Sequence, residues 1–110
     1  MSTYVRDISE AALDDELVQS EEPILVDFWA PWCGPCRAMA PAVEAAAEKL
    51  KGDAKVYKIN VDDNPSVSSR FNLRGIPTLI LFRDGREADR LVGLSSREQI
   101  EGLAARKITA

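Results

Sequence analysis

The apolar run ILVDFWA at residues 24–30 restricts the possible folds more than any other segment of the chain. A run of strand-forming residues that lacks polar alternation and is bounded by turn residues is typical of a central strand buried on both faces. Such a strand belongs to a sheet that helices cover on both sides. One carboxylate, Asp27, interrupts the run. The segment therefore predicts an α/β protein with this strand inside the sheet.

Helical patterns are expected on both sides of this strand. Before it, Ser9 can cap a first helix. The modest apolar face of that helix consists of Ala12, Leu13, Leu17 and Val18. The acidic and polar residues that follow, up to Pro23, predict that the helix ends before the strand begins.

A longer helix is predicted after the cysteines. Its apolar residues recur every three or four positions up to Gly52: Met39, Val43, Ala46, Ala47 and Leu50. Pro35 suits the first helical turn, where a backbone donor is not needed. Pro41 deprives residue 37 of a hydrogen-bond donor, so we expect a kink there rather than the end of the helix.

Three further strands are predicted in the second half of the chain. Residues 56–61 form the first of them and residues 79–82 the next. Asp84-Gly85 is a hairpin signal that leads into a strand at residues 88–92. The last two strands should therefore pair in an antiparallel hairpin.

Two further helices complete the pattern. Asn64-Pro65 predicts a short helix with proline at its first position. Ser95 with Glu98 three residues later predicts a capping box for a final helix. The residues of that helix expected to face the core are Ile100, Leu103, Ala104 and Ile108.

Together these elements predict an α/β fold of three layers, with a mixed sheet between helices and the antiparallel hairpin at one edge. A chain of 110 residues has the length of one domain, so we expect residues 1–110 to fold as a single unit. A chain of this size can bury roughly two-thirds of its unfolded surface. Its core therefore needs neither a disulfide nor a metal for stability.

Composition and charge exclude several classes of function. The chain has two Cys and no His, which excludes a His-based catalytic triad, a His-ligated metal site and a His general base. A net charge of −4 argues against nucleic-acid or anionic-membrane partners. The first residues lack the pattern of a signal peptide, and no stretch approaches the ~20 apolar residues of a membrane span. We therefore expect a cytoplasmic protein that acts as a monomer.

The two cysteines, Cys33 and Cys36, lie where the buried strand ends and the long helix begins. A zinc or iron–sulfur site normally needs four ligands, and this pair supplies only two of them. A structural disulfide closing so short a loop gains little entropy. A redox-active dithiol is the chemistry that remains.

The position of the pair predicts different roles for its two sulfurs. Cys33 at the helix N-terminus faces unpaired N–H groups and the positive end of the helix dipole, which favour the attacking thiolate. Cys36, one turn further in, should be more enclosed and stay protonated until it resolves the exchange. Gly34 and Pro35 set the backbone between them and should tune how readily the disulfide closes.

The motif Trp32-Cys33-Gly34-Pro35-Cys36 resembles that of the thioredoxin family. The likeness extends from about residue 4 to residue 108. It includes DFWA at residues 27–30, Pro41, Lys58, GIPT at residues 75–78 and Gly93. The resemblance implies the thioredoxin fold, with a mixed sheet of four or five strands and four helices. It also implies reduction of protein disulfides, with no bound cofactor and with electrons from NADPH through a thioredoxin reductase.

Asp27 is the candidate base of the site. A carboxylate in a buried strand has a raised pKa, and such a group can deprotonate Cys36. The alternative is an aspartate at the strand end that reaches water. The resemblance implies that Asp27 acts on Cys36 through a water and that Lys58 lies nearby and moderates it. From the residues alone, a strand lysine with its amine in solvent is the favoured interpretation of Lys58.

Several residues are candidates for substrate binding. The resemblance implies a cis bond between Ile76 and Pro77 in the Gly75-containing loop, facing the cysteines; from sequence alone, Pro77 also fits the beginning of a strand. The backbone of Ile76 would then pair with an extended substrate, giving a broad substrate range. Trp32, beside Cys33, and Gly93, through close approach, would complete an apolar docking surface.

The sequence thus predicts a general protein-disulfide reductase that carries electrons through Cys33 and Cys36 and contributes to cellular redox homeostasis. Two other functions stay open. A dedicated oxidase or isomerase would run the exchange in the opposite direction, in an oxidising compartment. A non-enzymatic subunit would use its surface to dock a larger protein. Trp29 is expected to pack against the helix that carries the cysteines.

Overall fold

The apolar run forms strand β2 (Ile24–Trp29), the central strand of a five-stranded sheet. The structure is a computed structural model that describes residues 4–108, except for the side chains of residues 106–108. The other elements are β1 (Arg6–Asp7), α1 (Glu10–Gln19), α2 (Gly34–Leu50), β3 (Lys55–Asn60), α3 (Ser66–Arg70), β4 (Thr78–Arg83), β5 (Arg86–Val92) and α4 (Arg97–Ile108).

The sheet is mixed, with the strand order β1-β3-β2-β4-β5. β3 pairs with β1 and β2 in parallel, whereas β4 is antiparallel to both β2 and β5. Asp27 of β2 therefore lies between Lys58 of β3 and Leu79 of β4. The predicted mixed sheet with an antiparallel hairpin at one edge is confirmed.

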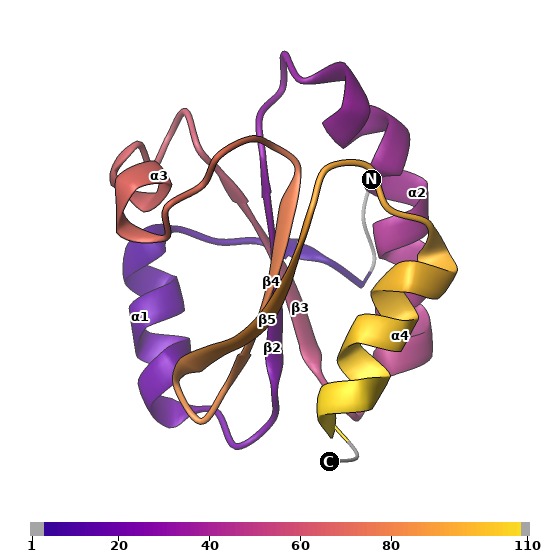
Figure 1. Cartoon of the computed structure of the whole chain (residues 1–110). Helices are drawn as coiled ribbons and strands as arrows, with labels where there is room; N and C mark the ends of the chain where they lie inside the picture. Colours follow the sequence, from indigo (N-terminus) through magenta and orange to yellow (C-terminus); the bar gives the residue numbers. More distant parts are fainter. Residues whose placement is uncertain (1–3, 109–110) are drawn as a thin grey trace.

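The side chains of β2 alternate between two cores, one on each face of the sheet. Leu25 points to α2 and α4, where Met39 and Leu103 belong to the same buried cluster. Val26 and Phe28 point to the opposite face, which α1 and α3 cover. Figure 1 shows these two pairs of helices on opposite sides of the sheet. The three-layer fold with four helices in the described chain agrees with the sequence prediction.

The beginning of α1 is as predicted, but its apolar face is narrower. The hydroxyl of Ser9 accepts a hydrogen bond from the N–H of Ala12 and caps the helix. Leu13 is completely buried, whereas Val18 is 86% exposed. The inclusion of Val18 in the apolar face was therefore wrong, because the last turn of α1 presents this position to solvent.

The long helix α2 continues through Pro41 without ending, as expected. Pro35 lies in its first turn. The short helix α3 begins at Ser66, one residue later than predicted. Pro65 has helical backbone angles but occupies the N-cap position, so it precedes the first helical residue.

The predicted capping box of α4 is displaced by one residue. The Ser96 hydroxyl accepts from the N–H of Gln99, and the Gln99 side chain accepts from the N–H of Ser96. Ser95 is buried instead, and its N–H points to the sulfur of Met39. Burial removes Ser95 from the capping position, so the box predicted from Ser95 and Glu98 was wrong. The predicted inward position of Ile108 lies outside the described side chains.

Three segments that join strands to helices lie at the same end of the sheet. These are the segments from β2 to α2, from α3 to β4 and from β5 to α4, all near the top of Figure 1. The first of them leads to the cysteines, and the second contains the predicted substrate-binding loop. Within residues 4–108, no helix combines the length and apolar character needed to cross a membrane.

Candidate redox-active site

Cys33 is the N-cap of α2, and Cys36 lies in the first turn of that helix. The two are joined by a disulfide, with 5.2 Å between their Cα atoms. Each residue is 4% exposed, so Cys36 is not more enclosed than Cys33 in this oxidised form, contrary to the sequence expectation. Three residues of separation at a helix start let both side chains turn towards the same core.

The two sulfurs differ in their hydrogen bonding rather than in exposure. Sγ of Cys33 accepts the backbone N–H of Cys36 at 3.2 Å. The free N–H groups of a helix N-terminus and the positive end of its dipole stabilise negative charge. A thiolate on Cys33 would receive this stabilisation directly, which suits it to nucleophilic attack.

Asp27 is buried in the middle of the strand that leads to the cysteines, with 6% of its surface exposed. Its Oδ1 has no hydrogen-bond partner among the described protein residues. Burial raises the pKa of Asp27 to about 7, and the nearby Lys58 opposes this rise. The alternative of a strand-end aspartate in water is therefore wrong, and Asp27 can exchange a proton near neutral pH.

Lys58 is held against the site rather than extended freely into solvent. It pairs in register with Asp27, and its Nζ lies 4.9 Å from the centre of the Trp29 ring. Trp29 packs against the small buried cluster of Ala30, Cys33 and Cys36. The expected packing of Trp29 beside the active-site helix is confirmed.

The loop before β4 brings a second backbone segment to the disulfide. The carbonyl oxygen of Ile76 lies 3.7 Å from Sγ of Cys33, and the Ile76-Pro77 bond is cis. The Thr78 hydroxyl donates to the carbonyl of Gly75 at 2.6 Å. The structure therefore brings Ile76 to Cys33, as the family resemblance implied.

Gly93 lies against the same loop and has a backbone conformation that favours glycine. Its N–H donates to the carbonyl of Pro77 at 2.8 Å. A Cβ added at Gly93 would meet nothing within 4 Å, but the φ angle is +89°. The glycine is needed for this left-handed backbone conformation, and its predicted close approach to a substrate stays a prediction. Gly34 and Gly75 likewise leave open space where a Cβ would stand.

Apolar side chains are exposed beside these segments. Trp32 is 66% exposed, and its indole N–H donates to the carboxylate of Asp62 at 3.0 Å. Trp32 and Ile76 line one hollow of about 210 Å³. Val92 and Leu94, on either side of the glycine bonded to the Pro77 carbonyl, are 58% and 64% exposed.

Sequence reasoning missed three residues of this surface. Val92 had a signal, because it is an outward apolar residue directly after the half-buried Leu91 in an edge strand. Leu94 and Asp62 had none. A surface leucine is ordinary, and only the tertiary structure brings Asp62 to the indole of Trp32.

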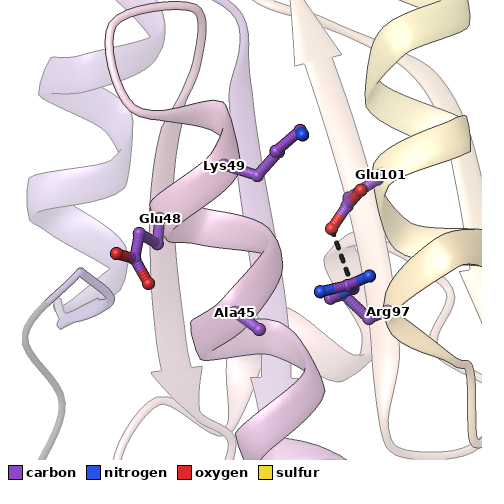
Figure 2. A pocket seen from close by; sticks show the side chains of 5 residues that line it. All are labelled: Ala45, Glu48, Lys49, Arg97 and Glu101. Carbon is purple, nitrogen blue, oxygen red and sulfur yellow. Dashed lines mark ion pairs between the residues drawn. The ribbon is translucent and has the colours of Figure 1, made fainter.

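A charged hollow of about 480 Å³ lies between α2 and α4. Figure 2 shows Lys49 on α2, opposite Arg97 and Glu101 on α4. Nε of Arg97 pairs with Glu101 at 3.2 Å. The lining contains no thiol, so this hollow is not the redox site. Within the described chain, no group of three His, Cys, Asp or Glu side chains could hold a metal ion.

Comparison with known proteins places the chain among its relatives. The family model described as Thioredoxin matches residues 4–106. The chain is 42% identical to the thioredoxin of Porphyra purpurea, over 88% of this chain and 91% of that protein. It is 49% identical to thioredoxin 1 of Synechococcus elongatus, over 78% and 80% of the two chains. It is also 49% identical to the thioredoxin of Alicyclobacillus acidocaldarius, over 82% and 86%.

The family model covers both cysteines and the loop opposite them, and the three relatives cover 78–88% of the chain. The cysteine pair is redox-active, and the protein is a thiol–disulfide oxidoreductase that works by dithiol–disulfide exchange. The sheet order, the disulfide at the start of α2 and the extent of sequence identity all lead to one conclusion: the chain belongs to the thioredoxin family.

Proposed function

We propose that the protein reduces disulfides of other proteins and that Cys33 is the attacking group. Its thiolate attacks one sulfur of the substrate disulfide, and the second sulfur leaves as a thiolate that takes a proton. A mixed disulfide between Cys33 and the substrate is the result. The N–H of Cys36, 3.2 Å from Sγ of Cys33, supports this assignment, because it stabilises the attacking thiolate.

Cys36 then resolves the mixed disulfide. Asp27 takes the proton of the Cys36 thiol, through a water as the family resemblance implies. The Cys36 thiolate attacks Sγ of Cys33 and releases the second substrate thiolate. Two electrons pass to the substrate, and the pair ends as the disulfide found in the structure. The pKa of Asp27, about 7, suits a group that accepts a proton near neutral pH.

Substrate binding is assigned to the surface around the disulfide. The main chain of Ile76 pairs with an extended substrate segment, while Gly75 and Pro77 hold the loop. Trp32 and Gly93 belong to the same docking surface. The carbonyl of Ile76 lies close enough to Cys33 for a segment bound there to present its disulfide to the sulfur. Main-chain recognition is tolerant of side chains, so many protein disulfides fit.

Lys58, Gly34 and Pro35 tune the redox reaction. Lys58 moderates the charge of Asp27, beside which it pairs across β2 and β3. Gly34 and Pro35 determine how readily the disulfide closes. A thioredoxin reductase that uses NADPH returns the pair to the dithiol form, so no cofactor is bound. The protein acts in this scheme as a monomeric electron carrier of the cytoplasm, a single domain of residues 1–110.

Reduction of insulin tests the proposal. With NADPH and a bacterial thioredoxin reductase, the protein is expected to consume NADPH in proportion to the insulin disulfides reduced. The Cys33→Ser variant should lose this activity. The Cys36→Ser variant should instead accumulate a mixed disulfide that is visible on a non-reducing gel. Undiminished turnover by Cys33→Ser, or no turnover by the wild type, contradicts the proposal.

A further inference from the structure

Helix α3 ends at Arg70, and the carbonyls of the next two residues lie beyond its hydrogen-bond ladder. These carbonyls belong to Phe71 and Asn72, and Asn72 has a φ angle of +52°. Arg90 of the edge strand β5 supplies donors from outside. Its Nη2 donates to the carbonyl of Phe71 at 2.8 Å, and its Nη1 lies 3.4 Å from that of Asn72.

The guanidinium of Arg90 is itself held in one orientation. Nε and Nη2 donate to the two carboxylate oxygens of Glu87 at 2.6 and 2.7 Å. This two-pronged pairing fixes the plane of the guanidinium, which a lysine cannot reproduce. The side chain of Arg90 is 26% exposed, so the arrangement is partly shielded from solvent. Residues of β5 thus reach across to the end of α3.

The segment that Arg90 anchors ends at the disulfide. Four residues after Asn72, the carbonyl of Ile76 lies 3.7 Å from Sγ of Cys33. The far end of the segment is attached at Gly75, which accepts the Thr78 hydroxyl. The loop is therefore held from both ends, and Arg90 holds the end that lies further from the cysteines.

We propose that Arg90, oriented by Glu87, is a positioning residue for protein substrates. It fixes the end of α3 and thereby the course of residues 73–76, so that the main chain of Ile76 stays in place before Cys33. The inference rests on the proposed docking of substrates along Ile76. A small disulfide that reaches Cys33 without pairing to the loop does not need this anchor.

The test compares two substrates, insulin and bis(2-hydroxyethyl) disulfide. Arg90→Gln is expected to raise KM for insulin about tenfold, because small misplacements of a docking element are costly. The tenfold rise corresponds to about 1.4 kcal/mol of lost docking energy. Reduction of the small disulfide should change by less than about twofold, because this substrate does not dock along the loop and the chemical step at Cys33 is unaltered. Arg86→Gln, an exposed arginine on the same strand, is the matched control and should behave like the wild type.

A charge-reversed double variant distinguishes two roles of Arg90: hydrogen bonding to the carbonyls after α3, and the ion pair with Glu87 alone. Glu87→Arg combined with Arg90→Glu keeps opposite charges at the two positions, but a carboxylate at position 90 cannot donate to carbonyls. The insulin defect should therefore persist in the double variant. Recovery of wild-type KM in the double variant overturns the proposal. Equal losses on both substrates in Arg90→Gln overturn it as well.

Hydrogen exchange in the oxidised protein provides a readout that needs no substrate. Glu87→Gln, a milder change that should fold normally, is expected to speed exchange of the amides of residues 73–76 relative to those of α2. Unchanged exchange there contradicts the anchor even if insulin is reduced normally. Failure of the wild type to reduce insulin contradicts the proposed function instead, so the two failures are distinguishable.

Discussion

Asp27 is a carboxylate that is buried in the central strand and has a pKa near neutrality. It lies in the middle of the central strand with 6% of its surface exposed, and its neighbours across the sheet are Lys58 and Leu79. Burial raises its pKa to about 7, against 3.8 for the ordinary side chain. Because the chain has no histidine, Asp27 takes the place of the side chain that usually gains or loses a proton near neutral pH.

Replacement of Asp27 by Asn should stabilise the protein, and increasingly so as the pH rises. The pKa of Asp27 is higher in the folded than in the unfolded state, so between about pH 4 and 7 the folded state binds more protons and wild-type stability falls with pH. The gain from Asp27→Asn should be small near pH 4 and level off above pH 7, at about 4 kcal/mol. Urea unfolding of the oxidised protein at several pH values measures it.

Asp53→Asn serves as the control for this pH dependence, because Asp53 is an exposed aspartate. It should leave the dependence of stability on pH close to that of the wild type. In insulin reduction, the wild-type rate should rise with pH near 7 as Asp27 ionises, and Asp27→Asn should lose this rise. A pH-independent stability difference between Asp27→Asn and the wild type would contradict the assigned burial effect.

At the scale of elements, the N-terminal caps of α2 and α4 show what local sequence rules can and cannot predict. The start of α2 is capped by Cys33 itself, so the reactive sulfur and the cap are one atom. The start of α4 is capped by Ser96 and Gln99. From sequence, the box is predicted one residue earlier, at Ser95 and Glu98, because local rules do not include burial. Contact of Ser95 with the core, through the N–H that points to the Met39 sulfur, decides the choice.

Substitutions at α4 distinguish the two boxes. Ser96→Ala should lower the free energy of unfolding by about 1 kcal/mol, because the N–H of Gln99 loses its acceptor. Glu98→Gln should change it by less than about 0.5 kcal/mol, since this exposed side chain caps nothing. Guanidinium unfolding curves measure both. The opposite order of effects would favour the box at Ser95 and Glu98.

Across the whole molecule, one sheet separates two cores that must form together. Leu25 contributes to one of them and Val26 to the other, although the two are consecutive residues of β2. A change in either core therefore weakens the same central strand. Small domains with such shared elements usually unfold in one cooperative step.

Leu13→Ala tests this coupling. Leu13 is fully buried between α1 and the sheet, on the face opposite to the cysteine-bearing helix. Its truncation should cost about 2–5 kcal/mol. Tryptophan fluorescence, which reports on Trp29 and Trp32 near the disulfide, and circular dichroism should show coincident transitions at the same lowered midpoint. Val18→Ala, an exposed position of the same helix, should stay within about 0.5 kcal/mol of the wild type. Separate transitions for the two probes would contradict a coupled structure.

Much of this protein follows from local rules applied to its sequence. The period of the apolar residues is enough for the order of strands and helices except β1, because burial selects it directly. β1 consists of two exposed residues, Arg6 and Asp7, which are too few and too polar to show a period. The position of Cys33 at a strand-to-helix junction predicts a stabilised thiolate from helix geometry alone. The resemblance carried by the cysteine motif and the GIPT loop supplied the family, which the comparisons confirm.

Only the tertiary structure decided which distant residues meet. The bond between Trp32 and Asp62 and the anchoring of α3 by Arg90 join positions far apart in the chain. The contact of Ile76 with Cys33 does so too, and the family resemblance alone had implied it. Such pairs leave no periodic trace, because each depends on how strands align and how loops close. Local sequence thus determined the elements and the reactive pair, whereas strand alignment and packing decided the surface that would receive a substrate.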